Sequence, residues 1–178
     1  MGTIYGGATA AAPGQQSALQ IAAVQAMCRR QAGWIGIVAV LTVVNSAGVA
    51  AGLDWNFLMG LGITTIIDIF AKKGAGTAGS VVAVAVAVIA GALFGLLWNF
   101  ARKGASWAFL VAGILYALDT LVYLLLAMAA GALWLNVALH GLALFYIFKG
   151  VGSAGSLKKL LAQQAAAVPG VISSSAPS

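Results

Sequence analysis

Four apolar runs, each close to 20 residues long, constrain the fold of this chain more than any other feature. They cover residues 33–53, 81–100, 107–129 and 131–148. A helix needs about 20 apolar residues to cross the hydrocarbon core of a bilayer, whereas a membrane β-strand needs only about 10. With 62% hydrophobic and 7% charged residues, this 178-residue chain is also too apolar for a soluble fold. The runs therefore predict an all-α integral membrane protein with a bundle of four transmembrane helices.

The tryptophans support the ends of these runs. Indole has one polar edge and prefers the bilayer interface to either bulk phase. All five tryptophans lie within a few residues of a predicted span end: Trp34, Trp55, Trp98, Trp107 and Trp134. The span boundaries are therefore predicted to within about one helical turn.

Residues 56–71 form an apolar segment that is too short to span comfortably. Its first 15 residues rise only about 22 Å as a helix, against a hydrocarbon core of about 30 Å. If the segment does not span, seven of the nine basic residues share one side with both termini; if it spans, the better division is five against four. The positive-inside rule therefore favours a short re-entrant or interfacial helix, with both termini cytoplasmic. Thr64 belongs to its small and polar stripe, and so does Asp68, which is expected to pair with Lys72 one turn later.

A surface segment is predicted on each side of the membrane domain, which covers residues 33–149. Residues 1–16 show no strong period and are expected to be irregular, and residues 17–32 are expected to form an amphipathic cytoplasmic helix capped by Ser17. After the last span, the glycines of residues 150–155 are expected to break the helix. A short basic helix and a mobile tail then complete residues 150–178.

Two ionisable residues lie in the middle of predicted spans, where a charge costs at least about 2.5 kcal/mol on insertion scales. Asp119 is in the third span and His140 in the fourth. A tight turn makes these spans an antiparallel hairpin, so the two depths differ by roughly 3 Å, which permits a direct or water-bridged contact. Tyr116 and Tyr123 lie on the helix face of Asp119, and Asn45 of the first span reaches the same depth. These five residues are the candidate intramembrane polar site, with three polar neighbours: Ser46, Thr120 and Asn136.

Each of these residues also has a structural interpretation. Asp119 can form an interhelical hydrogen bond with a neutral carboxyl, and a lone helical histidine is more often a satisfied donor in the core than a ligand. The simplest structural role of Asn45 is an interhelical hydrogen bond. Gly91 and Gly95 have the GxxxG spacing that lets two helix backbones approach closely, which predicts a packing or oligomerisation surface.

The residue inventory excludes most enzyme classes. The chain has no GxSxG, HExxH or phosphate-loop motif, and its single cysteine and single histidine cannot form a disulfide or complete a transition-metal site. We therefore expect no catalytic residue, no metal and no cofactor. The net charge of +6 requires no nucleic acid, because topology and anionic lipid headgroups at the cytoplasmic surface account for its sign.

Three functions remain. The first is a non-enzymatic subunit or assembly factor of a larger membrane complex, in which other membrane subunits or a homo-oligomer cover the small-residue faces. The second is a proton, ion or small-solute channel or transporter centred on Asp119 and His140. The third is a pH sensor in which protonation of His140 changes helix packing and moves the basic C-terminal helix. The first function requires the fewest assumptions about individual residues, and we therefore rank it first. The expected location is a bacterial inner membrane.

Overall fold

Four long α-helices make up most of the protein that the structure describes. The computed structural model describes residues 13–53, 76–130 and 134–167, together with Leu61, Thr64 and Ile67. The four helices are α1 (Pro13–Ala50), α3 (Gly76–Ala101), α4 (Ser106–Ala130) and α5 (Trp134–Ala167), and these described residues contain no strand. Each helix is long and apolar enough to cross a membrane. The predicted all-helical architecture with four candidate spans is confirmed.

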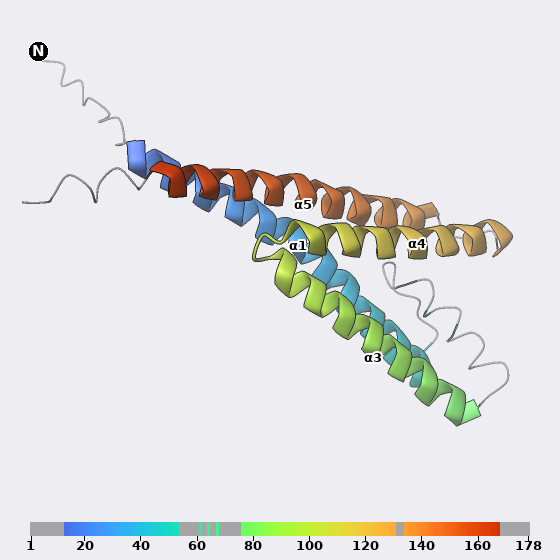
Figure 1. The fold of residues 1–178 in the computed structure, drawn as a ribbon. Coiled ribbons are helices and arrows are strands. Elements are labelled where there is room, and N and C mark those ends of the chain that lie inside the picture. The colour runs from blue at the N-terminus through green and yellow to red at the C-terminus, as the bar shows by residue number, and fades with distance from the viewer. Residues whose placement is uncertain are drawn as a thin grey trace, which may run out of the picture.

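The helices pack in a closed order, in which α1 contacts α3 and α5, and α4 contacts the same two helices. The N-terminal end of α1 and the C-terminal end of α5 lie together at one end of the molecule, where they extend past the α3–α4 turn (Figure 1). Toward the other end, α1 and α3 diverge as a pair from α4 and α5. We call these pairs the α1–α3 arm and the α4–α5 arm.

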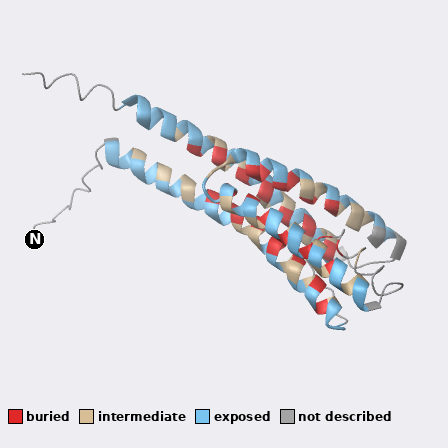
Figure 2. Cartoon of the chain, turned by 60° about the horizontal axis from the view of Figure 1, so that its bottom comes forward, coloured by how far each residue is buried: buried red, intermediate tan, exposed pale blue. Residues whose placement is uncertain are grey.

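The core lies where the four helices meet, and alanine makes up much of it. Small side chains let the helices approach closely, and a few large ones fill the remaining space, among them Ile35, Phe94, Phe109, Tyr116 and Ile147. Figure 2 shows the buried residues on the faces that the helices turn toward one another, with exposed residues along the projecting ends of α1 and α5.

The two arms are joined by an aromatic stack near the middle of α1 and α5. The rings of Trp34 and Tyr146 are 5.2 Å apart between centroids and almost parallel, at 3°. The outward faces of the helices are apolar, as Ile89 at 70% exposure and Met128 at 72% illustrate. Large exposed apolar side chains on every helix are what a lipid environment allows and water does not.

One difference from prediction is at the start of α1. The surface helix expected over residues 17–32 and the first span form one uninterrupted helix that begins at Pro13. Ser17 is therefore not its cap, and its hydroxyl instead donates to the carbonyl of Gly14 at 2.9 Å. Proline suits the first helical turn, because its fixed φ is already helical and its missing N–H needs no partner there.

A second difference is in α5, which continues through residues 150–155, where the glycines were expected to end it. A glycine costs only about 1 kcal/mol in a helix interior, which packing readily offsets. Gly150 shows how: a Cβ at this position would collide with the ring of Phe109 on α4. The glycine permits close contact between helices and does not terminate one.

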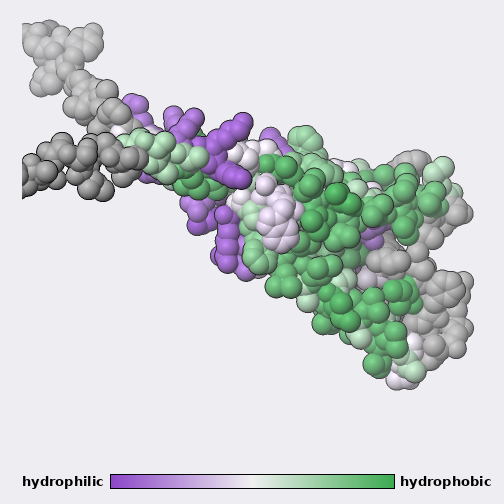
Figure 3. Space-filling model, viewed as in Figure 1, coloured by the Kyte–Doolittle hydropathy of each residue, from purple (hydrophilic) through white to green (hydrophobic). Residues whose placement is uncertain are grey.

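Hydrophilic side chains gather at the end where α1 and α5 project, and hydrophobic ones cover most of the remaining face in Figure 3. Seven of the nine basic residues are described, and all seven are exposed: Arg29, Arg30, Arg102, Lys103, Lys149, Lys158 and Lys159. Lys72 and Lys73 lie outside the described residues. The assignment of the basic end to the cytoplasm stays a prediction.

The predicted re-entrant or interfacial helix lies mostly outside the described residues, and Asp68 is among those outside. Leu61 and Thr64 are both buried, and the hydroxyl of Thr64 donates to the carbonyl of Leu61 at 2.8 Å. These two side chains therefore pack inside the protein. The re-entrant course of the whole segment stays a prediction.

Candidate intramembrane polar site

Polar and aromatic side chains share one face of α4. Counted from Tyr116, the other three side chains follow after three residues (Asp119), four residues (Thr120) and seven residues (Tyr123). These spacings place all four on adjacent turns of one helical side. Tyr116 and Asp119 are buried, and Thr120 and Tyr123 are partly buried. The hydroxyl of Thr120 donates to the carbonyl of Tyr116 at 2.7 Å, so it is satisfied within its own helix.

His140 of α5 lies between two of these side chains. Its ring stacks on Tyr116 at 5.3 Å between centroids and 8°, and on Tyr123 at 4.8 Å and 11°. The two tyrosines are seven residues apart, which separates them by about 10.5 Å along the helix axis. One tyrosine therefore covers each face of the imidazole, and the His140 side chain is 1% exposed.

The hydrogen bonds of His140 fix the role of one ring nitrogen. Its Nδ1 lies 2.8 Å from the backbone carbonyl oxygen of Asn136, one turn earlier in α5. A carbonyl oxygen can only accept, so Nδ1 carries the proton and donates. Nε2 is therefore the basic nitrogen of the neutral ring, and the position where a second proton would bind.

Asn136 extends the cluster to a second contact between the helices. Its amide Nδ2 donates to the hydroxyl of Tyr123 at 2.5 Å. Its Oδ1 and the hydroxyl of Tyr116 are buried and find no hydrogen-bond partner among the described residues. A buried polar atom without a partner costs about 1–3 kcal/mol, so the cluster holds two groups that a water or a polar solute would stabilise.

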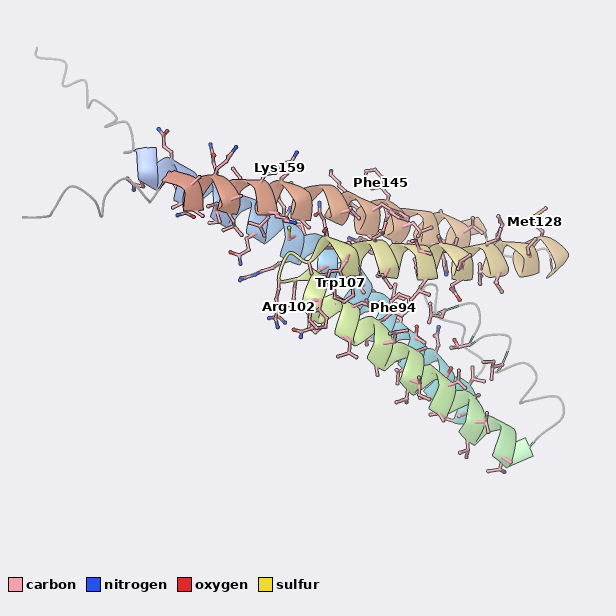
Figure 4. The ribbon with its side chains drawn as sticks, in the orientation of Figure 1. Phe94, Arg102, Trp107, Met128, Phe145 and Lys159 are labelled. Atoms are coloured by element: carbon pink, nitrogen blue, oxygen red, sulfur yellow. The ribbon has the colours of Figure 1, made fainter. Side chains whose placement is uncertain are left out.

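The cluster is closed on the α3 side by an aromatic ring. Phe94 packs edge-on against Tyr116, with centroids 6.5 Å apart and planes at 76°. In Figure 4 Phe94 lies in the angle between α3 and α4. The site is thus enclosed by aromatic rings, which lowers the local polarity around its ionisable groups.

The remaining predicted site residues lie at different distances from this cluster. Asp119 is buried on α4, one turn from each tyrosine, and its predicted contact with His140 stays a prediction. Asn45 is partly buried and Ser46 fully buried, but both belong to α1 in the other arm. Sequence reasoning placed all of these residues at one depth and missed the stacking, which depends on how α5 is rotated about its axis.

The two predicted packing glycines have different surroundings. A Cβ on Gly91 would stand 2.6 Å from Cγ2 of Val43 and 3.1 Å from the carbonyl oxygen of Ala39. Gly91 therefore lies at the close approach of α1 and α3. A Cβ on Gly95 would meet nothing within 4 Å, so Gly95 faces open space.

The chemistry of the cluster is that of proton binding. The described residues contain no group of three side chains suited to hold a metal ion. They do stack one imidazole between two phenols in the α4–α5 arm, with one carboxyl on the same face of α4. The chain matches no protein-family model, and neither curated proteins nor solved structures provide a match. Four helices long and apolar enough to span a membrane suggest the class, a multi-pass helical membrane protein, and any proposal about function rests on the site.

Proposed function

We propose that the protein is a proton-responsive membrane helix bundle, in which protonation of His140 changes the packing of α4 against α5. The observation that carries this proposal is the enclosure of the imidazole between Tyr116 and Tyr123. A neutral imidazole stacks on these rings as an ordinary aromatic, whereas an imidazolium is also attracted electrostatically to both π faces. The two protonation states therefore differ in how strongly α5 is held against α4.

The continuity of α5 supports transmission of this change along the protein. The helix has 34 residues and a length of about 51 Å. His140 lies near its start, and the exposed pair Lys158 and Lys159 lies near its end. A small tilt or rotation at the buried site would therefore displace the basic end, without any hinge at residues 150–155.

Few charged or ionisable groups compete with His140 for control of this response. On α4, those near it are Tyr116, Asp119 and Tyr123. On α1, which also packs against α5, the described charged residues are Arg29 and Arg30 at the basic end. Asp119 is the one acidic residue that the structure describes on these helices.

Nuclear magnetic resonance of the reconstituted full chain tests the proposal directly, because the chain contains a single histidine. With ¹⁵N-labelled histidine, the ring signals report the protonation state of His140 as the pH is varied. A fluorine label is attached at Gln163→Cys in a Cys28→Ala background. The chemical shift of this label is expected to change together with the protonation of His140. His140→Phe should abolish the shift of the label, and Phe145→Leu on an exposed face of the same helix should leave it unchanged. A label whose signal does not change when the ring signals of His140 report its protonation would overturn the proposal.

A second candidate is a pathway for protons or a small polar solute through the same cluster. It is favoured by the unpartnered Tyr116 hydroxyl and Asn136 Oδ1, which are positioned to exchange hydrogen bonds with a mobile species. Asp119→Asn is then expected to abolish flux into liposomes while the bundle remains folded, and unchanged flux would exclude the pathway. The function as an accessory subunit stays a prediction, because lipid covers the exposed apolar faces as well as a protein partner would.

A further inference from the structure

An open apolar groove of about 760 Å³ runs along α1 and α3. Its floor is formed by glycine: a Cβ on Gly33 or Gly95 would meet no neighbouring atom within 4 Å. Its walls include Val40, Val44 and Trp98. Val40 is 62% exposed, so the groove opens away from the bundle. The hollow exists because the glycine positions lack side chains, and a larger residue at either would fill it.

Three exposed arginines lie one helical turn beyond one end of the groove. Arg29 and Arg30 precede Gly33 by four and three residues on α1, so they continue the groove-lining face. Arg102 follows Trp98 by four residues, and its backbone amide still donates to the Trp98 carbonyl at 2.9 Å. The guanidinium carbon of Arg102 is 5.1 Å from the centroid of the Trp98 ring, which holds the charge near the groove. Figure 4 shows Arg102 projecting from the end of α3.

These arginines have no carboxylate near them among the described residues. The chain has three acidic residues, of which the structure describes Asp119 alone. Asp119 lies thirteen residues into α4 from Ser106, about 20 Å along the helix. The positive charge at the end of the groove is therefore available to an anionic ligand.

We infer that the groove binds an anionic phospholipid, with an acyl chain along the glycine floor and the phosphate at the arginines. Gly33 and Val44 are eleven residues apart, which is about 16 Å along a helix, close to half of a hydrocarbon core of about 30 Å. An acyl chain of one leaflet ends at that depth, whereas a partner helix would make contacts across the whole core. Guanidinium groups bind phosphate in a bidentate manner, and basic pockets between membrane helices recognise lipid headgroups. This inference does not depend on the protonation of His140.

Native mass spectrometry of the full chain released from micelles, titrated with dioleoyl phosphatidylglycerol or dioleoyl phosphatidylcholine, tests the inference. The wild-type chain is expected to bind the anionic lipid in preference to the zwitterionic one. Gly95→Leu places a side chain in the groove at a position where its Cβ meets no protein atom within 4 Å. It is expected to weaken phosphatidylglycerol binding by at least about tenfold. Gly141→Leu is the matched control, because its position on α5 is equally open but lies outside the groove. Arg102→Gln is expected to weaken phosphatidylglycerol binding by about fivefold and leave phosphatidylcholine binding unchanged.

Each alternative occupant gives a different result. Equal binding of the two lipids by the wild-type chain, or wild-type affinity in Gly95→Leu with its helical content intact, would overturn the inference. Inorganic phosphate that binds as tightly as the lipid would reduce the site to its arginines and refute the role of the groove. A change of oligomeric state in Gly95→Leu, with lipid binding unaltered, would assign the groove to a second copy of the chain. Gly33→Leu, at the other side of the floor, repeats the test if Gly95→Leu does not fold.

Discussion

Replacement of Gly91 and of Gly95 by alanine, one at a time, is expected to change the stability of the protein in opposite directions. The two glycines are one turn apart on α3, and their GxxxG spacing treats them as equivalent. In the structure the two positions differ. A new methyl group at Gly91 would lie 2.6 Å from Val43 and 3.1 Å from the Ala39 carbonyl oxygen, whereas the same group at Gly95 would meet nothing within 4 Å.

The difference between the two variants isolates the cost of the collision. Alanine is favoured over glycine in a helix interior by about 0.5–1 kcal/mol, and this gain is common to both substitutions. Overpacking costs about 1–3 kcal/mol, and valine relieves it poorly because its χ1 is restricted. Gly95→Ala is therefore expected to gain up to about 1 kcal/mol. Gly91→Ala is expected to be about 1–3 kcal/mol less stable than Gly95→Ala.

Reversible unfolding in mixed micelles, followed by circular dichroism as the fraction of denaturing detergent rises, measures both free energies. A third variant strengthens the comparison: Val43→Ala removes the methyl group that obstructs position 91. In combination with Gly91→Ala it should restore part of the loss, which a double-mutant cycle reports as a favourable coupling. Equal unfolding midpoints for Gly91→Ala and Gly95→Ala, or no coupling to Val43→Ala, would refute the proposed close approach of α1 and α3.

The same unfolding assay tests three further expectations. Tyr123→Phe should destabilise the protein by about 0.6–1.7 kcal/mol, because the Asn136 amide loses its acceptor; an unchanged midpoint would count against that hydrogen bond. Tyr116→Phe should be neutral or stabilising by up to about 1 kcal/mol, since its buried hydroxyl has no described partner, and a loss as large as that of Tyr123→Phe would contradict this. Gly150→Ala should cost about 1–3 kcal/mol, because the new methyl group collides with an aromatic ring of α4, whereas Gly152→Ala, which is open, should cost nothing.

The spans were predictable because hydrophobic length in a membrane is set by one external dimension, the thickness of the hydrocarbon core. The N-terminal end of α1 and the C-terminal end of α5 could not be predicted in the same way, because they depend on contacts between helices. Local propensity favours a cap at Ser17 and a break at residues 150–155. The observed helices instead begin at Pro13 and run through Gly150, where contact with Phe109 offsets the cost of glycine.

For the polar cluster, the sequence indicates which residues of α4 share a face and roughly the depth of His140, but not the geometry. Spacing on α4 places Tyr116, Asp119 and Tyr123 on one face, and the hairpin places His140 near their depth. Nothing in the spacing says that the imidazole enters between the two rings, because this depends on the rotation of α5 and on side-chain rotamers. The unpartnered Tyr116 hydroxyl is likewise a property of three-dimensional packing.

The two proposed sites lie on different arms, and this separation makes each a control for the other. His140 and its tyrosines belong to the α4–α5 arm, whereas the groove lies on the α1–α3 arm. The aromatic stack of Trp34 on Tyr146 connects the arms close to the end of the groove at Gly33. If lipid binding changed with pH in the wild-type chain but not in His140→Phe, the coupling would have to cross either the contact of Phe94 with Tyr116 between α3 and α4 or the contact between α1 and α5. Trp34→Leu removes the aromatic part of the α1–α5 contact and leaves both sites intact. If the coupling takes the α1–α5 route, this variant should weaken the pH dependence without abolishing lipid binding, whereas an unchanged pH dependence would assign the coupling to Phe94 and Tyr116.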